Sequence, residues 1–311
     1  MDWILSLLLA TVRLAIPVLL ISLAELYGQR AGMVNIGLEG LASIGALVGF
    51  LVCYVTGSNW LGLLCGALAG ILVNMIYAFS TVTLCADHTV YGMAVNIFAP
   101  ALASFIYRVY FGTGSDLKQI TTMASIAIPG LKDIPVIGPL LFDQSPMVYL
   151  TFVLVIVTAV FFGKTRAGLS YKSVGEHPQA ADSVGINVYK MRYAGVILSG
   201  ALGAVGGLAY IVPPVQTWNF EVGVAGAGFL ALAVMIFGQW KPFHIFGAAM
   251  FFAVFKSLAN IADSTFLAQL HWSSNIYNMM PFVASMVILA FTSKNSMAPK
   301  AEGIPYDKGS R

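Results

Sequence analysis

The stretch Met147-Val-Tyr-Leu-Thr-Phe-Val-Leu-Val-Ile-Val-Thr-Ala-Val-Phe-Phe162 is almost continuously apolar. A membrane-spanning strand alternates apolar and polar side chains over about ten residues, whereas a helix that crosses the bilayer core of about 30 Å needs about 20 apolar residues in a row. Only helices and closed barrels satisfy every backbone polar group inside lipid. The stretch and its flanks therefore predict a transmembrane helix.

The rest of the 311-residue chain repeats this pattern, with 59% apolar and only 9% charged residues. A soluble domain has about a quarter charged residues. We predict an all-α polytopic membrane protein with about nine transmembrane helices, in a range of about eight to ten. The first span has no basic leader and no cleavage pattern, which indicates a retained helix. The predicted spans are residues 4–26, 35–55, 60–84, 90–111, 146–163, 191–212, 223–237, 243–262 and 277–291.

The distribution of basic residues predicts the orientation. The loop of residues 164–192 contains the basic residues Lys164, Arg166, Lys172, Lys190 and Arg192. The loop of residues 212–223 contains no basic residue, and its one charged residue is Glu221. The positive-inside rule therefore puts the first loop and the C-terminus in the cytoplasm and the N-terminus outside. We expect a transmembrane domain over residues 1–293, with a cytoplasmic loop at 164–190. The tail of residues 294–311 lacks apolar periodicity and is predicted to be disordered.

Several classes of function are excluded. The three cysteines form no C-x-x-C pair and the four histidines are scattered, so no metal site is predicted. A net charge of +3 is too small to indicate nucleic-acid binding. The segment Gly163-Lys164-Thr165 lacks the glycine that a phosphate-binding loop needs five residues earlier, because Thr158 stands there. The chain is therefore not predicted to bind or hydrolyse ATP, and no other catalytic motif is present.

Glycines at intervals of four residues indicate close helix packing inside lipid. They are Gly45 and Gly49, Gly62, Gly66 and Gly70, and Gly203 and Gly207.

Polar residues inside predicted spans are candidates for a solute pathway, since each is costly in lipid. Asn96 precedes the helix-breaking Pro100, and Asn35 is expected to cap the second span. Glu39 is expected either to pair with Arg30 or to serve an inner gate. Aromatic residues can stack on a planar ring of a solute or belong to an interfacial belt. The candidate pathway set is Asn35, Glu39, Tyr91, Asn96, Trp218 and Phe229.

The cytoplasmic loop is too long for a simple connection. Pro178 suits the first turn of a helix, Glu176 suits its N-terminal end, and Gly185 suits a left-handed stop. These residues predict a short helix from about residue 178 to 184.

Four stretches together resemble a known family. The loop Val174-Gly-Glu-His-Pro-Gln-Ala-Ala-Asp-Ser-Val-Gly-Ile186 resembles the coupling-helix signature of the branched-chain amino acid, ribose and nucleoside permeases of ABC importers. Three others resemble the nucleoside and simple-sugar branch of that family. They are Arg30-Ala-Gly-Met-Val-Asn-Ile-Gly-Leu-Glu-Gly40, Val90-Tyr-Gly-Met-Ala-Val-Asn-Ile-Phe-Ala-Pro100 and Gly226-Ala-Gly-Phe-Leu-Ala-Leu-Ala-Val-Met-Ile-Phe-Gly-Gln-Trp-Lys-Pro242. Gln239 departs from the branch, which often has lysine there.

The resemblance implies a type II-like ABC importer permease, a non-enzymatic subunit that moves nucleosides across the bacterial inner membrane by alternating access. It implies three partners: a second and different permease, an ATP-binding subunit and an extracytoplasmic solute-binding lipoprotein. The chain itself would bind no cofactor, while the ATP-binding subunit would use ATP and Mg²⁺. The residues expected to couple to that subunit are Gly175, Glu176, His177, Pro178, Ala180, Ala181, Gly185 and Ile186.

Two alternatives remain at this point. A simple sugar, a purine base or riboflavin could replace the nucleoside as cargo. An ion-coupled secondary transporter is the alternative from another class, and it usually needs ionisable residues near the bilayer midplane. The acids Glu25, Asp87 and Glu221 are expected at helix ends, which disfavours that alternative.

Overall fold

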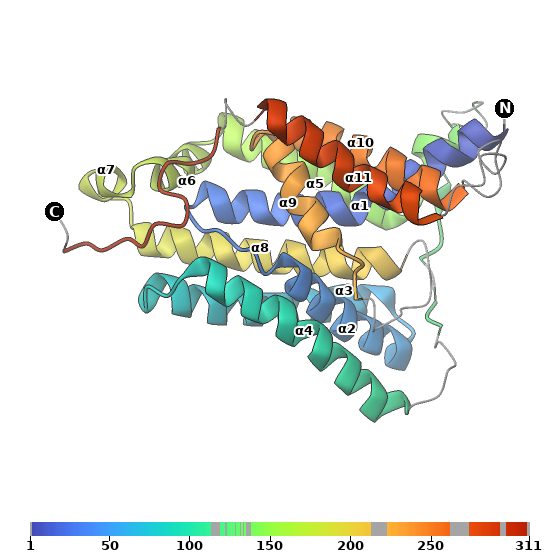
Figure 1. Cartoon of the computed structure of the whole chain (residues 1–311), viewed down its shortest axis with the longest axis horizontal. Coiled ribbons are helices and arrows are strands. Elements are labelled where there is room, and N and C mark those ends of the chain that lie inside the picture. The colour runs from blue at the N-terminus through green and yellow to red at the C-terminus, as the bar shows by residue number, and fades with distance from the viewer. Residues whose placement is uncertain are drawn as a thin grey trace.

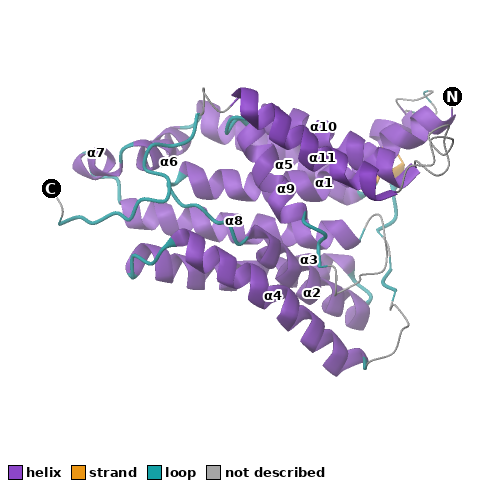
Figure 2. Cartoon of the chain, in the orientation of Figure 1, coloured by secondary structure: helices purple, strands orange, loops and turns teal. Residues whose placement is uncertain are grey.

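The computed structural model describes residues 2–112, 119–121, 123–127, 129, 130, 132, 134, 138–212, 223–261, 274–292 and 297–309. The described chain is mainly helical (Figures 1 and 2). Its α-helices are α1 (Asp2–Arg30), α2 (Leu38–Thr56), α3 (Asn59–Ala78), α4 (His88–Phe111), α5 (Pro146–Lys164), α6 (Arg166–Glu176), α7 (Pro178–Ser183), α8 (Val188–Ile211), α9 (Ala227–Phe237), α10 (Pro242–Ile261) and α11 (Ser274–Thr292). Two π-helical turns, η1 (Phe79–Thr83) and η2 (Gly138–Phe142), and an antiparallel pair of short strands, β1 (Ile126–Ala127) and β2 (Asp143–Gln144), complete it.

The membrane-spanning helices confirm the predicted class. Within the described residues, seven helices are long and apolar enough to cross a bilayer: α1, α2, α3 continued by η1, α4, α5, α8 and α10. The chain is therefore a multi-pass membrane protein. The predicted ninth span corresponds to α11, and the total of nine stays a prediction.

The predicted span of residues 223–237 is wrong in length. The helix there, α9, has 11 residues and is about 16 Å long, about half of a bilayer core of about 30 Å. Positive φ angles at Gly223, Ala225 and Gly226 prevent the helix from starting earlier. An apolar run does not reveal such a break, because it says nothing about backbone conformation.

Helices α1 and α8 run along the length of the molecule. In Figure 1, α2, α3 and α4 lie on one side of them and α5, α10 and α11 on the other, with the two termini at opposite ends. The middle of α1 is buried all round, including Leu19, Leu20, Ile21 and Leu23, which fits its uniformly apolar sequence. Helix α4, by contrast, is mostly exposed, and Ile97 on it is 74% exposed.

The predicted close packing at glycines four residues apart is confirmed where α2 and α3 contact α8. A Cβ atom at Gly45 would run into the backbone of Ala204, and one at Gly207 would run into the carbonyl oxygen of Ala42. Such contacts let backbones approach closely, so dispersion attraction provides the packing that the hydrophobic effect cannot provide in lipid.

After α1, the chain turns back into the bundle before α2 begins (Figure 1). Gly32 at the turn has a φ of 83°. Leu41, near the start of α2, packs against Gly203, which lies about 22 Å along α8 from the first residue of that helix. The start of α2 therefore lies inside the membrane-spanning bundle.

The structure corrects the prediction of a disordered tail. Residues 297–309 are described, and both Ala301 and Tyr306 are buried. The backbone N–H groups of Ala301 and Gly303 donate to the carbonyl oxygens of Gly175 (2.9 Å) and Gly32 (3.0 Å). A few buried side chains and backbone hydrogen bonds hold this segment, and none of them requires the periodic pattern on which the prediction relied.

Candidate functional site

The starts of α2 and α9 meet inside the bundle, where a carboxylate connects them. The N–H of Gly226 donates to Oε1 of Glu39 (2.9 Å), and the N–H of Gly228 donates to Oε2 (2.7 Å). Glu39 is only 9% exposed. Its carboxylate thus satisfies two of the N–H groups that a helix leaves free at its first turn, where the helix dipole also favours a negative charge. We call residues 35–40 and 226–228 the helix-start junction.

The two backbones of the junction are in close contact. A Cβ atom at Gly228 would run into the backbone nitrogen of Glu39. On the other side of the same segment, the N–H of Gly40 donates to Oδ1 of Asn96 (2.8 Å), and Nδ2 of Asn96 donates to the carbonyl oxygen of Ile36 (2.9 Å). A single side chain of α4 therefore pairs a free N–H in the first turn of α2 and a carbonyl oxygen of the backbone before it, both of which would be costly to leave unpaired in lipid.

Asn35 occupies a different place from the one predicted. Helix α2 begins at Leu38 with Gly37 as its N-cap, so Asn35 lies two residues too early to cap it. Oδ1 of Asn35 instead accepts from the N–H of Gly37 (3.0 Å), and its Nδ2 donates to Oδ1 of Asn74 (3.2 Å). Asn74 in turn donates to the carbonyl oxygen of Val196 on α8 (2.9 Å). The junction is thus connected to α3 and α8.

The predicted pairing of Glu39 with Arg30 is wrong. Arg30 donates to the carbonyl oxygen of Trp240 (2.8 Å) and lies 3.9 Å from Glu176. The cation that interacts electrostatically with Glu39 is Lys256 of α10. Its Nζ lies 5.2 Å from the centre of the Tyr210 ring, a distance at which the ring face attracts a cation.

The aromatic candidates lie in different surroundings. Phe229, in the first turn of α9, is 49% exposed, so the junction lies next to the molecular surface. Tyr91 is partly buried on α4 with its ring centre 5.1 Å from that of Tyr77. Trp218 lies outside the described residues. The structure therefore brings Asn35, Glu39, Asn96 and Phe229 together around the junction.

The loop after α5 contains two helices, of which the sequence predicted one. Helix α7 (Pro178–Ser183) matches the predicted short helix, with Pro178 in its first turn. Gly185 has a φ of 87°, and the N–H of Ile186 donates to the carbonyl oxygen of Ala181 (3.0 Å), which closes the helix in the expected way. Glu176, however, ends the unpredicted helix α6 and does not start α7.

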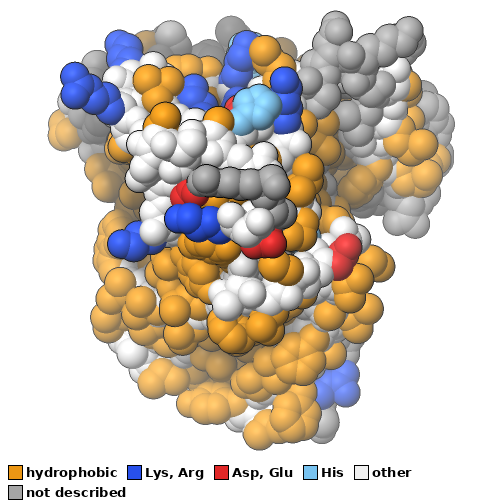
Figure 3. Space-filling view, turned by 90° about the vertical axis from the view of Figure 1, so that its left-hand side faces the viewer, with side chains coloured by type: hydrophobic (Ala, Val, Ile, Leu, Met, Phe, Trp, Pro, Cys, Tyr) orange, Lys and Arg blue, Asp and Glu red, His pale blue; other side chains and the backbone are white. Residues whose placement is uncertain are grey.

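The coupling candidates range from buried to exposed. Gly175 and Ala181 are buried, and a Cβ atom at Gly175 would run into the carbonyl oxygen of Arg30. His177 and Ala180 are exposed, and Val184 beside them is 75% exposed. Figure 3 views this end of the molecule and shows basic side chains at several places on it. Helix α7 therefore presents an accessible surface while one side of it is anchored.

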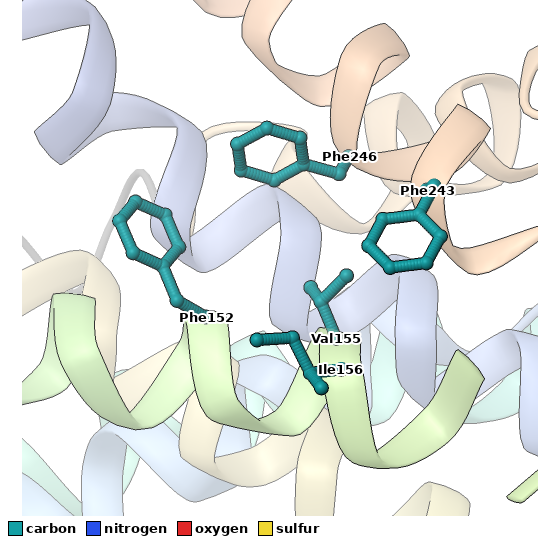
Figure 4. A pocket seen from close by; sticks show the side chains of 5 residues that line it. All are labelled: Phe152, Val155, Ile156, Phe243 and Phe246. Carbon is teal, nitrogen blue, oxygen red and sulfur yellow. The ribbon is translucent and has the colours of Figure 1, made fainter. Parts of the chain in front are cut away.

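The apolar pocket between α5 and α10 has a different character. It has a volume of about 260 Å³ and is lined by Phe152, Val155, Ile156, Phe243 and Phe246, whose side chains converge in Figure 4. None of these side chains can form a hydrogen bond. This pocket is therefore not suited to recognise a polar solute.

The comparisons with known proteins agree on one family. The family model described as the permease component of branched-chain amino acid transport systems matches residues 7–290. The chain belongs to this permease family. It is 39% identical to the nucleoside ABC transporter permease protein NupC of Lactococcus lactis subsp. cremoris, over 94% of this chain and 93% of that protein. No solved structure matches it.

Two further relatives are named for two different cargoes, guanosine and glucose. The permease is 39% identical to the guanosine ABC transporter permease protein NupQ of Bacillus subtilis, over 97% of this chain and 96% of that protein. It is 32% identical to the putative glucose ABC transporter permease protein TsgC13 of Haloferax volcanii, over 86% of this chain and 81% of that protein. Family membership identifies the permease as a transporter subunit and not an enzyme.

The permease also contains a buried chain of hydrogen-bonded polar side chains that is not predicted from the sequence. Glu25 was expected at a helix end, but α1 continues to Arg30 and Glu25 is fully buried. Its Oε1 accepts from Nε2 of Gln29 (2.8 Å) and from the N–H of Asn35 (3.0 Å). Oε1 of Gln29 accepts from Nε1 of Trp240 (2.6 Å). Because Glu25 and Glu39 are both buried, the positions of the acids do not exclude ion coupling. The family and the ABC permeases to which the chain is similar favour the ABC class instead.

Proposed function

We propose that this permease is one of two membrane subunits of an ABC importer that carries nucleosides into the cell by alternating access. The observation that carries the mechanism is the helix-start junction. Helices that begin inside the membrane mark the solute site in many transporters, because their free backbone groups and dipoles are available there. The cargo is proposed from the names of the two relatives that are 39% identical over nearly the whole chain.

The partners follow from the same proposal. An ATP-binding subunit that uses ATP and Mg²⁺ contacts α7 through exposed residues such as His177 and Ala180, and this chain binds no cofactor. A second, different permease completes the path across the membrane, and a solute-binding lipoprotein delivers the cargo. The C-terminus is cytoplasmic and the N-terminus is outside, which the basic residues of the 164–192 loop support.

The proposed path runs past the helix-start junction. Asn35, Glu39 and Asn96 hold the backbone of the junction in place, and Phe229 and Tyr91 offer ring faces to a base. Trp218, which lies outside the described residues, stays a candidate for the same role. A nucleoside is neutral, so the path needs no unpaired charge, and the Glu39 carboxylate and the Asn96 amide are both paired with backbone groups in the conformation described. We infer that this conformation is closed at the junction and that the starts of α2 and α9 separate during transport.

A second candidate cargo is a simple sugar. The relative named as a putative glucose permease is 32% identical over most of the chain, and a nucleoside contains a ribose. The two cargoes differ in the base, so aromatic stacking separates them.

Uptake into right-side-out or reconstituted vesicles, with the ATP sealed inside them, tests both proposals. Vesicles that contain this chain with its neighbouring transporter subunits are supplied with labelled guanosine or labelled glucose, with and without ATP. ATP-dependent guanosine uptake that unlabelled nucleoside suppresses is the expected result. Glucose uptake alone would move the cargo to the sugar class, and uptake driven by a proton gradient without ATP would refute the ABC mechanism.

A further inference from the structure

Residues 297–309, here called the C-terminal strap, begin at the turn that ends α9. The N–H of Met297 donates to Oε1 of Gln239 (3.1 Å). Gln239 and Trp240 have φ angles of 50° and 55°, a left-handed conformation that non-glycine residues rarely adopt.

The strap then crosses the ends of α6 and α1. Ala301 and Gly303 donate their backbone N–H groups to Gly175 of α6 and to Gly32 of the turn after α1, at 2.9 and 3.0 Å. Backbone hydrogen bonds hold main chain against main chain, without the rotational freedom of long side chains. The middle of the strap is therefore fixed to both helices.

The far end of the strap is anchored beside α7. Tyr306 is 7% exposed and packs into a cluster with Val174, Ala181 and Val188. Its ring centre lies 5.5 Å from that of Tyr189 on α8. Lys308 lies 3.4 Å from Asp182 of α7, but the Lys308 side chain is 65% exposed and solvent screening keeps the contribution of this pair small. Tyr306 is thus the main anchor.

Helix α7 depends on this anchor, because Ala181 is its one buried residue among the six, and Ala181 belongs to the cluster with Tyr306. Helix α9, at the other end of the strap, begins at the Glu39 carboxylate and ends at Phe237, and the N–H of Gln239 in the following turn donates to the carbonyl oxygen of Ile236 (3.0 Å). The strap therefore spans the distance between the exposed α7 surface and the cytoplasmic end of the half-length helix at the junction.

We propose that the C-terminal strap is the mechanical link that transmits the movement of α7 to α9, and that it moves with α7 as one body. The proposal rests on the proposed function in one respect, namely that an ATP-binding subunit contacts α7. The strap thereby makes transport depend on a segment outside the membrane-spanning helices.

The first test removes the link in the assembled transporter. A chain that ends at residue 296 and the variant Tyr306→Ala are compared with Ile304→Ala, whose side chain is 55% exposed on the same strap. The expected result is normal co-purification of the subunits and normal basal ATP hydrolysis, with loss of cargo-stimulated hydrolysis and of uptake in the first two only. Uptake at the wild-type rate by the truncated chain would overturn the proposal.

A cross-link keeps the test decisive if the truncated chain fails to assemble. Asp182→Cys and Lys308→Cys are introduced together after Cys65 and Cys85 are replaced by serine, while Cys53 is buried. A bismaleimide then joins the strap to α7. Full uptake by the cross-linked transporter is expected, because the two move together. Loss of uptake after cross-linking would overturn the proposal, because it would mean that the strap must leave α7. Each single-cysteine variant, treated with the same reagent, is the control and should keep its uptake.

A third readout does not depend on the cargo. The exposed side chain of Phe229 in the first turn of α9 is replaced by cysteine, and its maleimide labelling is measured with and without ATP. We expect an ATP-dependent change with the intact strap and none with Tyr306→Ala. An identical change in both chains, or no change in the intact chain, would refute the link. A failure of guanosine uptake in the wild type would count against the cargo alone.

Discussion

Oε2 of Glu39 lies 2.7 Å from the backbone nitrogen of Gly228, although 189 residues separate the two in the chain. Helix α9 has a glycine at its N-cap and receives no cap hydrogen bond from that position. A carboxylate from α2 takes over this role. A buried backbone donor without a partner costs several kcal/mol in lipid, so the start of α9 is stable only while α2 is in place.

Replacement of Glu39 by glutamine tests this dependence. The amide keeps one acceptor oxygen but replaces the other with a donor, which faces one of the N–H groups of Gly226 and Gly228. A hydrogen bond to a charged group is worth about 1.5–3 kcal/mol, so we expect ATP-driven uptake to fall by about 10- to 100-fold while membrane insertion is retained. Thr56→Val, at the exposed end of the same helix, is the control. Wild-type uptake by Glu39→Gln would show that the carboxylate is dispensable.

Replacement of Gly207 by alanine tests the packing of α2 on α8. The added methyl group would run into the carbonyl oxygen of Ala42, and overpacking of this kind costs about 1–3 kcal/mol. We expect a lower midpoint of thermal unfolding in detergent. The matched control is Gly163→Ala, where the added atom meets nothing within 4 Å and alanine favours the helix by about 1 kcal/mol. Equal midpoints for the two variants would contradict the close contact.

The strap should detach more readily as the pH rises. Burial raises the pKa of Glu302 to about 7 from its ordinary 4.5, and Glu25 of α1 interacts electrostatically with it. The docked strap therefore binds a proton that the free strap does not, so docking weakens between about pH 4.5 and about pH 7 and is constant outside that window.

Hydrogen exchange of residues 297–309 measures this effect after correction for the intrinsic pH dependence. Protection is expected to be greater at about pH 5 than at about pH 7.5 in the wild type. In Glu302→Gln, which cannot ionise, protection should be the same at both values. A similar loss of protection in this variant would assign the pH dependence to another group.

The sequence predicted those features that short stretches encode. Continuous apolar runs gave the spanning helices, because a single helix satisfies its own backbone in lipid. Pro178 and Gly185 gave α7, since the conformational limits of both residues are local. The close contacts of α2 with α8 were predictable from glycines four residues apart, because this spacing alone places them on one helix face.

Features that depend on distant partners could not be predicted. The partner of Glu39 is the backbone of Gly226 and Gly228, which has no side-chain signature, so Arg30 appeared to be the natural partner. Residues 223–237 have the apolar composition of a full span, and this composition does not reveal the positive φ angles that delay the start of α9 to Ala227. Glu25 was placed at a helix end because no residue type in the sequence marks where α1 stops. The strap is held by backbone hydrogen bonds, to which any residue except proline can donate.

Replacement of Gly185 by proline tests the end of α7. Gly185 has a φ of 87° and its N–H donates to the carbonyl oxygen of Asp182 (3.0 Å). Proline fixes φ near −65° and has no N–H, so the variant loses both the turn and the hydrogen bond, and the direction of α7 changes. We expect cargo-stimulated ATP hydrolysis to fall to the basal rate in a transporter that still inserts and assembles. Val184→Ala, an exposed change one residue earlier, should leave stimulation unchanged. Full stimulation in an assembled Gly185→Pro transporter would mean that the geometry of α7 does not matter for coupling.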